Sequence, residues 1–179
     1  CILLDMHVKA YVWTIKKNPV SRQRAMLTQT TEYALRAVTF LARQARRGKQ
    51  ITQGTHADSG KTWKSGIVKE AVSEPICVRR LNLDGDEQAD LVHHGGPDKA
   101  VLVYPAQNYE AWRNEFPSIN WQPGSFGENL TLVGVTEDDV CIGDVFGLGN
   151  CILQVSQPRQ PCWKLSRRWN LPKLAVWVQ

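Results

Sequence analysis

The sequence lacks the cysteine patterns of disulfide-bonded and zinc-binding proteins. Its 179 residues include five cysteines, and these form neither a CxxC pair nor a zinc spacing. An odd, scattered set of cysteines in a chain of this length is typical of reduced thiols, so we expect a cytoplasmic protein. No apolar run approaches the roughly 20 residues that a membrane-spanning helix needs, and Asp5 and His7 interrupt the apolar start too early for a signal peptide. We therefore expect no membrane partner.

Several enzyme motifs and ligand classes are also missing. The sequence contains no Gly-x-Ser-x-Gly elbow, no P-loop and no dinucleotide fingerprint, which argues against the enzyme classes that carry them. The net charge of +5 is compatible with an anionic ligand, but the 22 basic residues are spread along the chain and form no stripe. A nucleic-acid partner is therefore not expected. The length and the 42% share of hydrophobic residues suffice for one domain with a sizeable core.

The N-terminal third contains one helical pattern. Residues 1–25 stay unassigned, and because the chain does not begin with methionine we expect the native start elsewhere, with Met26 as a candidate. Residues 26–48 show apolar residues at helical spacing, threonines that can cap the start and a glycine that ends the pattern, which predicts an isolated helix. Its first part, residues 26–38, resembles the opening of iron–sulfur-sensing winged-helix repressors, but no recognition helix, wing or cysteine triplet follows. Residues 49–60 are polar and glycine-rich, which predicts a linker or a loose hairpin.

Over residues 61–179 the pattern changes to short strand-like segments that are separated by glycine turns, with a helix opened by Pro105. Frequent short strands with few helices predict a mostly-β barrel. The expected strands cover residues 66–72, 76–83, 100–104, 128–133, 140–148 and 151–156.

The stretch that ends at Cys162 concentrates residues that can carry chemistry. A strand-like run leads into a loop whose prolines, Pro158 and Pro161, restrict the backbone and present Cys162 on a stiff bend. Arg159 and Lys164 lie close to it in the sequence, and cationic neighbours lower the pKa of a thiol, so we expect a soft metal ligand or a nucleophile here. The alternative is that Cys162 is a small buried hydrophobic residue.

A second concentration of polar residues precedes the strand at 100–104. Gly95 and Gly96 let backbone N–H groups approach a ligand and can form an anion-binding nest, while His94 could hydrogen-bond the ligand or shuttle protons near neutral pH. Asp86, Asp90 and His94 together offer a metal site as an alternative. The other alternative is a solvated turn whose histidine has its own partners.

Two smaller features could contact a ligand. Lys64 and Ser65 place a cation and a hydroxyl beside a strand, as a phosphate would need, although a surface lysine is the alternative. Asn129 points into the protein as a polar contact or caps a turn. Cys162 with His94 imitates a cysteine hydrolase, but no orienting Asn or Asp can be assigned, so we do not favour that mechanism.

The order of these motifs along the chain resembles a known family. The motifs are Lys64-Ser65-Gly66-Ile67, His94-Gly95-Gly96-Pro97-Asp98-Lys99-Ala100-Val101, Phe126-Gly127-Glu128-Asn129-Leu130 and Gln157-Pro158-Arg159-Gln160-Pro161-Cys162-Trp163-Lys164-Leu165. The series resembles the MOSC domain (molybdenum cofactor sulfurase C-terminal domain), specifically its YiiM-like branch, from about residue 61 to the last residue. The resemblance implies a MOSC-type β-barrel, mostly β with a few helices. We expect it to be incomplete at the C-terminus, because YiiM-like proteins continue beyond the position of Gln179.

The resemblance also implies a cofactor and its ligands. Such a domain binds the molybdenum cofactor (molybdopterin), in which the pterin's dithiolene and one protein cysteine hold the metal. Cys162 matches that cysteine, as the metal ligand and catalytic residue. The positions that match cofactor-binding residues are Lys64, Ser65, His94, Gly95, Gly96, Asn129 and Arg159.

An activity follows from the same resemblance. YiiM-like proteins reduce N-hydroxylated bases such as 6-N-hydroxylaminopurine with electrons from partner redox proteins, and the cofactor carries that chemistry while the protein orients it. A homodimer is a further expectation. The alternatives are a non-catalytic carrier of the molybdenum cofactor or of sulfur, and an inactive truncated gene product. MOSC domains also occur beside pyridoxal-phosphate-dependent sulfurase domains, but no lysine-bearing fold for pyridoxal phosphate is present, so that cofactor would be an inherited family label only.

Overall fold

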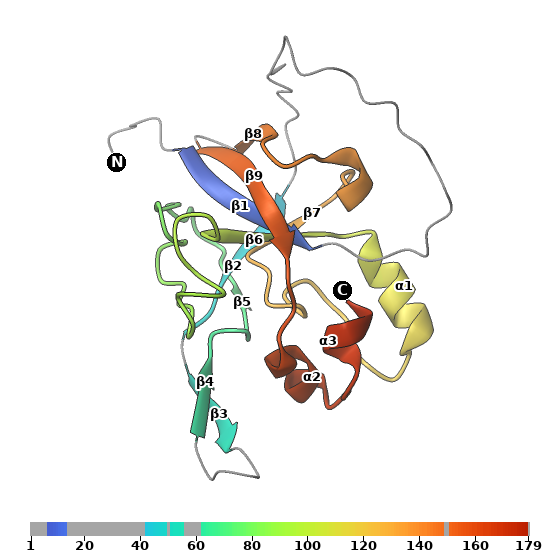
Figure 1. Ribbon diagram of the computed structural model, residues 1–179. Coiled ribbons are helices and arrows are strands. Elements are labelled where there is room, and N and C mark those ends of the chain that lie inside the picture. The colour runs from blue at the N-terminus through green and yellow to red at the C-terminus, as the bar shows by residue number, and fades with distance from the viewer. Residues whose placement is uncertain (1–6, 14–41, 50, 56–61, 149–150, 179) are drawn as a thin grey trace.

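The computed structural model describes residues 7–13, 42–49, 51–55, 62–148 and 151–178, and these residues are mostly strand (Figure 1). The strands are β1 (His7–Trp13), β2 (Ala42–Arg47), β3 (Ile51–Thr55), β4 (Thr62–Ser65), β5 (Glu70–Ala71), β6 (Val101–Pro105), β7 (Leu130–Leu132), β8 (Val145–Leu148) and β9 (Cys151–Arg159). The helices in the described residues are α1 (Asn108–Glu115), α2 (Trp163–Trp169) and α3 (Leu174–Trp177), with one 3-10 turn at Glu137–Asp139. The expectation of a mostly-β fold with a few helices is confirmed.

Seven strands form one mixed sheet in the order β5-β2-β7-β6-β1-β9-β8. Strands β1, β6, β7 and β9 pair in parallel, whereas β2 and β8 join them antiparallel. Within the described residues the edge strands β5 and β8 do not pair with each other, so the sheet is open, as expected of an incomplete barrel. Strands β3 and β4 form a separate antiparallel hairpin that projects from the sheet on the side of α2 (Figure 1).

The structure corrects the interpretation of the N-terminal third. Residues 42–47, the end of the predicted helix, form β2, which pairs antiparallel with β7 and β5. Helical spacing is a local signal, and pairing with distant strands overrides it here. Residues 51–55, predicted as part of a linker or a loose hairpin, form β3, which pairs with β4 as a hairpin. Residues 7–13, left unassigned, form β1 in the middle of the sheet. The rest of the predicted helix, with the stretch that resembles winged-helix repressors, lies outside the described residues.

Strand β6 divides the interior into two hydrophobic clusters. Its side chains alternate between the two faces of the sheet, so that Leu102 and Tyr104 join an aromatic cluster while Val101 and Val103 join an aliphatic one. The aliphatic cluster also takes side chains from β7 and β9. All five residues of β6 are buried, which explains the continuous apolar run in this part of the sequence.

The three helices lie near one another on one side of the molecule (Figure 1), and they pack on the aromatic cluster. Each contributes a buried side chain, namely Trp112 from α1, Leu165 from α2 and Leu174 from α3. Helix α2 ends at Asn170, whose φ of 52° is left-handed and stops the helix so that the chain can turn into α3. In the described part of the chain, no helix has the length and apolar character needed to cross a membrane.

Candidate functional site

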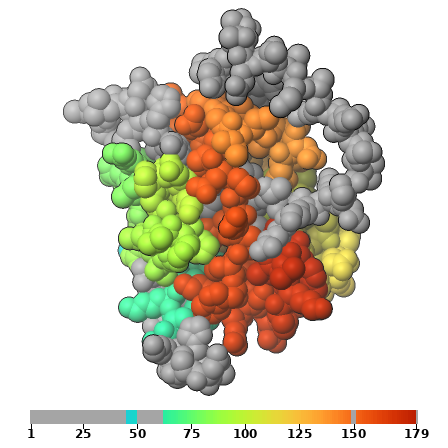
Figure 2. Space-filling view, in the orientation of Figure 1, coloured from blue at the N-terminus to red at the C-terminus, as the bar shows by residue number. Residues whose placement is uncertain are grey.

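A cleft lies where β9 ends and α2 begins. It consists of two cavities that share Asp90, His94, Arg159, Cys162 and Lys164 in their linings. The larger has a volume of about 420 Å³, which is within the usual range for small-molecule sites. Figure 2 shows the two sides of this cleft next to each other, the green loop that precedes β6 and the orange and red chain of β9 and α2.

Cys162 stands at the start of α2 and lines both cavities. Strand β9 ends at Arg159, and the following loop turns the chain so that Cys162, in extended conformation (φ −117°, ψ 166°), caps the helix. Its carbonyl oxygen accepts a hydrogen bond from the backbone N–H of Leu165 at 3.1 Å. The thiol is free and half-buried, so Cys162 is neither an exposed surface residue nor a fully buried core residue. The thiol activation predicted from the cationic neighbours stays a prediction.

Below Cys162, the floor of the cleft is a buried polar network of Lys69, Asp86 and Asn129. The Asp86 carboxylate accepts hydrogen bonds from Lys69 Nζ, from Gly48 N at 2.7 Å and from Asn129 Nδ2 at 2.9 Å. Burial lowers the pKa of Lys69, and the adjacent Asp86 opposes that shift. Only 5% of the Lys69 side chain and none of the Asp86 side chain is exposed, so the two form a buried ion pair.

Asn129 connects this floor to the strands. Its Nδ2 also donates to the carbonyl of Arg46 in β2 at 3.1 Å, and its Oδ1 accepts from the backbone N–H of Leu102 in β6 at 3.0 Å. The side chain points inward and lines the smaller cavity, which corresponds to the first of the two alternatives that the sequence left open. Because both of its amide hydrogens and its oxygen are engaged, Asn129 holds Asp86 in place; its predicted contact with a cofactor stays a prediction.

The metal site considered for Asp86, Asp90 and His94 is wrong. Asp86 is paired with Lys69, and no group of three or more His, Cys, Asp or Glu side chains in the described residues could hold a metal ion. The Asp90 carboxylate accepts hydrogen bonds from the backbone N–H groups of Val92 and His93, at 3.0 and 2.9 Å, and these bonds together with the His93 ring lower its pKa to about 2. Asp90 therefore orders its own loop.

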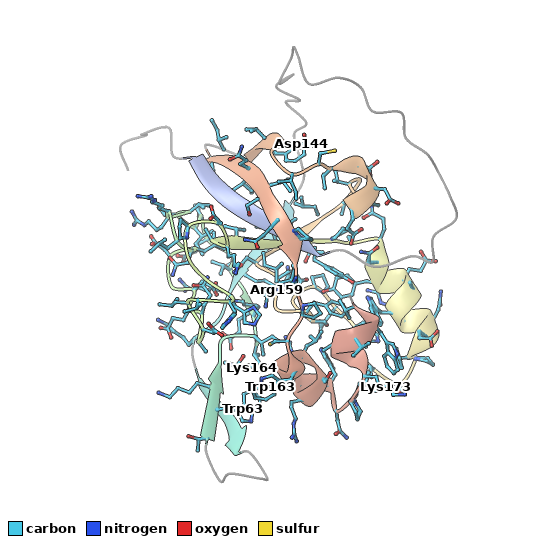
Figure 3. The ribbon with its side chains drawn as sticks, in the orientation of Figure 1. Trp63, Asp144, Arg159, Trp163, Lys164 and Lys173 are labelled. Atoms are coloured by element: carbon cyan, nitrogen blue, oxygen red, sulfur yellow. The ribbon has the colours of Figure 1, made fainter. Side chains whose placement is uncertain are left out.

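The mouth of the cleft is the segment Arg159, Cys162, Trp163 and Lys164, at the end of β9 and the start of α2. Figure 3 labels Arg159, Trp163 and Lys164 of this segment. Apart from histidines, the charged residues that line the larger cavity are three cations, Lys99, Arg159 and Lys164, and one carboxylate, Asp90. The mouth therefore favours an anionic ligand, with which the basic net charge of the sequence is compatible.

His94 faces these cations from the opposite loop. Burial, followed by the positive charge of Arg159, lowers the pKa of His94 to about 4, and Lys164 and Lys99 act in the same direction. The imidazole is neutral at pH 7, which does not favour a proton shuttle near neutral pH in the free cleft. The shuttle stays a prediction. Its role as a hydrogen-bonding group toward a ligand stays a prediction.

The two glycines after His94 shape the loop. Gly96 has a φ of 95°, a conformation that favours glycine, and a Cβ on Gly95 would lie 3.0 Å from Leu91 Cδ2. Neither glycine belongs to the described lining of the two cavities. The anion-binding nest predicted at Gly95 and Gly96 therefore stays a prediction.

Lys64 and Ser65 have different positions. Ser65 is buried and lines the smaller cavity, where its hydroxyl accepts a hydrogen bond from Ile67 N at 3.1 Å and keeps its own hydrogen to donate. Lys64 is exposed and is absent from the described lining of either cavity. Its carbonyl oxygen accepts a hydrogen bond from Lys164 Nζ at 2.7 Å, so Lys64 anchors a residue of the mouth through its backbone.

No motif in the sequence pointed to Lys69 or to the tryptophans beside the cleft. Lys69 stands 17 residues from Asp86 along the chain, and no local pattern links them. Trp63 and Trp163 form an edge-to-face pair with ring centroids 5.2 Å apart, one from β4 and one from α2. Because both pairs join residues that are distant in sequence, a motif search along one segment could not find them.

Family comparison agrees with this fold and site. The MOSC domain model matches residues 90–179, half of the chain, a range that includes His94, Arg159 and Cys162. A solved structure, YiiM from Geobacillus stearothermophilus, superposes with a TM-score of 0.56 at 32% identity over 76% of this chain and 60% of the other. The fold is thus of the YiiM type, and the chain belongs to the MOSC domain family.

Curated relatives match a similar share of the chain. The "Uncharacterized protein YflK" of Bacillus subtilis (strain 168) is 51% identical over 67% of this chain and 54% of its own length. "Protein YiiM" of Escherichia coli (strain K12) is 42% identical over 64% of this chain and 52% of its own. A protein named "Reductase" from Gibberella moniliformis (strain M3125 / FGSC 7600) is 38% identical over 61% of this chain and 20% of its own. The chain spans about half the length of the two bacterial relatives.

Proposed function

We propose that this MOSC domain binds the molybdenum cofactor through Cys162 and acts in an oxidoreductase that reduces N-hydroxylated bases such as 6-N-hydroxylaminopurine. The observation that carries the proposal is a half-buried free thiol in a cleft whose mouth also holds Arg159 and Lys164. MOSC domains are associated with this cofactor, and one relative is named a reductase.

The donor set of the cleft fits the cofactor. The cleft contains one cysteine, and the described residues include no group of three or more His, Cys, Asp or Glu that could hold a metal ion. Such a site suits a metal that is held mostly by the cofactor's own ligands. Arg159 and Lys164 would offset the charge of the cofactor's phosphate, and the Ser65 hydroxyl has a hydrogen to donate. His94, neutral at pH 7, would offer a hydrogen bond to the polar edge of the pterin without adding charge.

When bound, the cofactor supplies a metal that exchanges two electrons and accepts oxygen. The protein's own residues then have distinct tasks. Cys162 holds the metal, the cations of the mouth orient the anionic end, and the buried pair of Lys69 and Asp86 keeps the floor rigid beneath them. Rigid support of this kind determines how precisely a ligand is positioned.

Other parts of the proposal concern the whole protein. Electrons would come from a redox partner protein, the domain would work in the cytoplasm, and two copies would associate as a homodimer. A carrier of the cofactor without turnover would use the same cleft and the same cysteine, so activity measurements must separate the two functions.

The test is metal analysis of the purified chain and of two matched cysteine variants. We expect near-stoichiometric molybdenum in the wild type and in Cys151→Ala, which removes another half-buried thiol of the same segment, and its loss in Cys162→Ala. Stoichiometric molybdenum in Cys162→Ala would overturn the assignment of Cys162. Reduction of 6-N-hydroxylaminopurine by the loaded protein with a chemical electron donor would show the reductase, whereas loading without turnover would show the carrier.

A further inference from the structure

Helix α2 begins directly after Cys162, so the position of the helix determines where the thiol stands in the cleft. Three side chains of α2 donate hydrogen bonds to backbone carbonyls of other segments. Lys164 holds a carbonyl of β4 near the start of the helix, and Trp169 Nε1 donates to the carbonyl of Ser125 at 2.9 Å at its end. The third side chain, Arg168, makes two such bonds.

Arg168 joins α2 to two segments that are distant in the sequence. Its Nη1 donates to the carbonyl of Ile67 at 2.7 Å and to the carbonyl of Gly124 at 2.9 Å, across 101 and 44 residues of chain. The side chain is half-buried, and hydrogen bonds from a charged donor are stronger than those between neutral groups. One guanidinium group therefore fixes three segments against one another.

Both carbonyls belong to walls of the smaller cavity. Ile67 lines this cavity, and its backbone N–H donates to Ser65 Oγ at 3.1 Å, so the same residue contacts Arg168 through its carbonyl and Ser65 through its N–H. The carbonyl of Gly124 also accepts a hydrogen bond from the N–H of Gly127, another residue of the lining, at 3.0 Å. Each bond of Arg168 thus reaches a wall of the cavity.

We infer that Arg168 is a positioning residue, which sets the Cys162 thiol at a fixed place relative to the Ser65 hydroxyl. Arg168 is absent from the described lining of either cavity, so it acts through the carbonyls of Ile67 and Gly124. The inference rests on the proposed function, in which the thiol holds the metal and the hydroxyl faces the anionic end of the same cofactor. A ligand that engages two walls at once requires that the walls keep their separation.

The test measures this relative position by cross-linking in a Ser65→Cys background of the full chain. An ethylene-spaced bismethanethiosulfonate first modifies one sulfur and then closes onto the other, and mass spectrometry of the linked peptides follows the closing step. Closing depends on where the second sulfur lies, whereas modification of Cys162 by the monofunctional methyl methanethiosulfonate depends on that thiol alone. Misplacement of reacting groups by about 1 Å can cost about 100-fold in rate.

We expect Arg168→Met to slow the closing step by about 10- to 100-fold and to leave the monofunctional modification of Cys162 unchanged. Arg168→Lys, which keeps a cation and a donor, should lose less. The matched control is Arg167→Met, because Arg167 is the adjacent, exposed arginine of the same helix. It should close at the rate of the background protein.

Circular dichroism melts show whether each variant folds, and all rates are measured well below the melting transition. If Arg168→Met does not fold, Arg168→Gln takes its place, with the same slowing expected because its shorter, neutral side chain cannot reach both carbonyls. An unchanged closing rate in the folded variant, or equal slowing of closing and of monofunctional modification, would overturn the positioning role.

Failure of this role and failure of the proposed function are distinguishable, because cross-linking requires no cofactor. Slow closing in Arg168→Met, with no molybdenum in the wild type, would keep the positioning role and overturn the proposed function. Molybdenum in the wild type with unchanged closing in Arg168→Met would do the reverse. If both proposals hold, Arg168→Met should also lose molybdenum that Arg167→Met retains.

Discussion

The floor and the mouth of the cleft satisfy their charges in different ways. On the floor, Lys69 and Asp86 are almost completely buried, and Asp86 receives hydrogen bonds from a lysine, an amide and a backbone N–H. At the mouth, Arg159 and Lys164 are half-buried and line a cavity of about 420 Å³. Buried charges must be paired inside the protein, whereas half-buried charges can be shared with a ligand. The difference indicates that the floor supports the site and that the mouth binds.

The largest expected effect on stability comes from removing the charge partner of Lys69 on the floor. Asp86→Ala leaves the ammonium of Lys69 buried without its carboxylate, and we expect a loss of about 3–5 kcal/mol in the free energy of unfolding, measured by urea denaturation. Glu87→Ala is the matched control, since Glu87 pairs with Lys49 at the surface, where an ion pair contributes about 1 kcal/mol or less. Equal destabilisation by the two variants would contradict the distinction between floor and surface.

A smaller loss is expected from Asn129→Asp. The change replaces the amide that donates to Asp86 Oδ2 at 2.9 Å by a carboxylate and removes the bond to the carbonyl of Arg46. We expect about 2–3 kcal/mol of destabilisation by the same assay, since buried partners lose their hydrogen bonds. The exposed Asn114→Asp serves as the control and should change stability by about 0.5 kcal/mol or less. A stability near that of the wild type would show that the floor tolerates an unpaired carboxylate.

The pH dependence of stability tests the environment of His94 at the cleft. Its pKa of about 4 lies below the ordinary 6.5, so as pH falls from about 6.5 to 4 the unfolded chain takes up a proton that the folded chain does not. The free energy of unfolding must therefore decrease over this window, on the order of 1–2 kcal/mol once solvent screening of this half-buried group is discounted. His94→Gln should remove that part of the decrease in denaturation curves at pH 7 and pH 4.5, and an unchanged pH dependence would contradict the shift.

The smallest effect on stability is expected at the mouth. Lys164→Met removes one bond to the Lys64 carbonyl, at a surface where such bonds contribute about 1 kcal/mol or less. Its effect should be on binding instead, because a cation near the anionic end of the cofactor is lost and molybdenum content after dialysis falls. Lys173→Met, on the far side of α2 in Figure 3, should keep the wild-type content. Equal molybdenum content in the two variants would remove Lys164 from the site.

The sequence was a good guide where the signals were local. Strand β9 and the bend that presents Cys162 follow from residues adjacent in the chain, as do β6 and α1, although β9 continues past the expected residues 151–156 and includes Pro158. Of the residues expected at the site, Ser65, His94, Asn129, Arg159 and Cys162 all line the cleft, whereas Lys64, Gly95 and Gly96 do not belong to its described lining. The order of motifs thus predicted which segments meet, but a motif could not say which side chain of a segment faces the cavity.

Local signals were a poor guide where pairing with distant strands decided the structure. Residues 42–47 have helical spacing and yet form β2, because β5 and β7 offer hydrogen bonds and burial on both sides. The strand expected at 76–83 is reduced to a single bridge between Val78 and Leu83. In both segments the outcome depended on which distant strand was available as a partner.

By itself, the sequence determined a mostly-β fold and placed Cys162 at the end of a stiff, basic loop, because strand propensity, proline restriction and motif order act over a few adjacent residues. Only the tertiary structure decided that Lys69 neutralises Asp86 beneath the cleft, that burial keeps His94 neutral, and that Trp63 meets Trp163 at its edge. Burial, pairing of charges and ring contacts arise between residues far apart in the chain, and they exist only once the strands have paired.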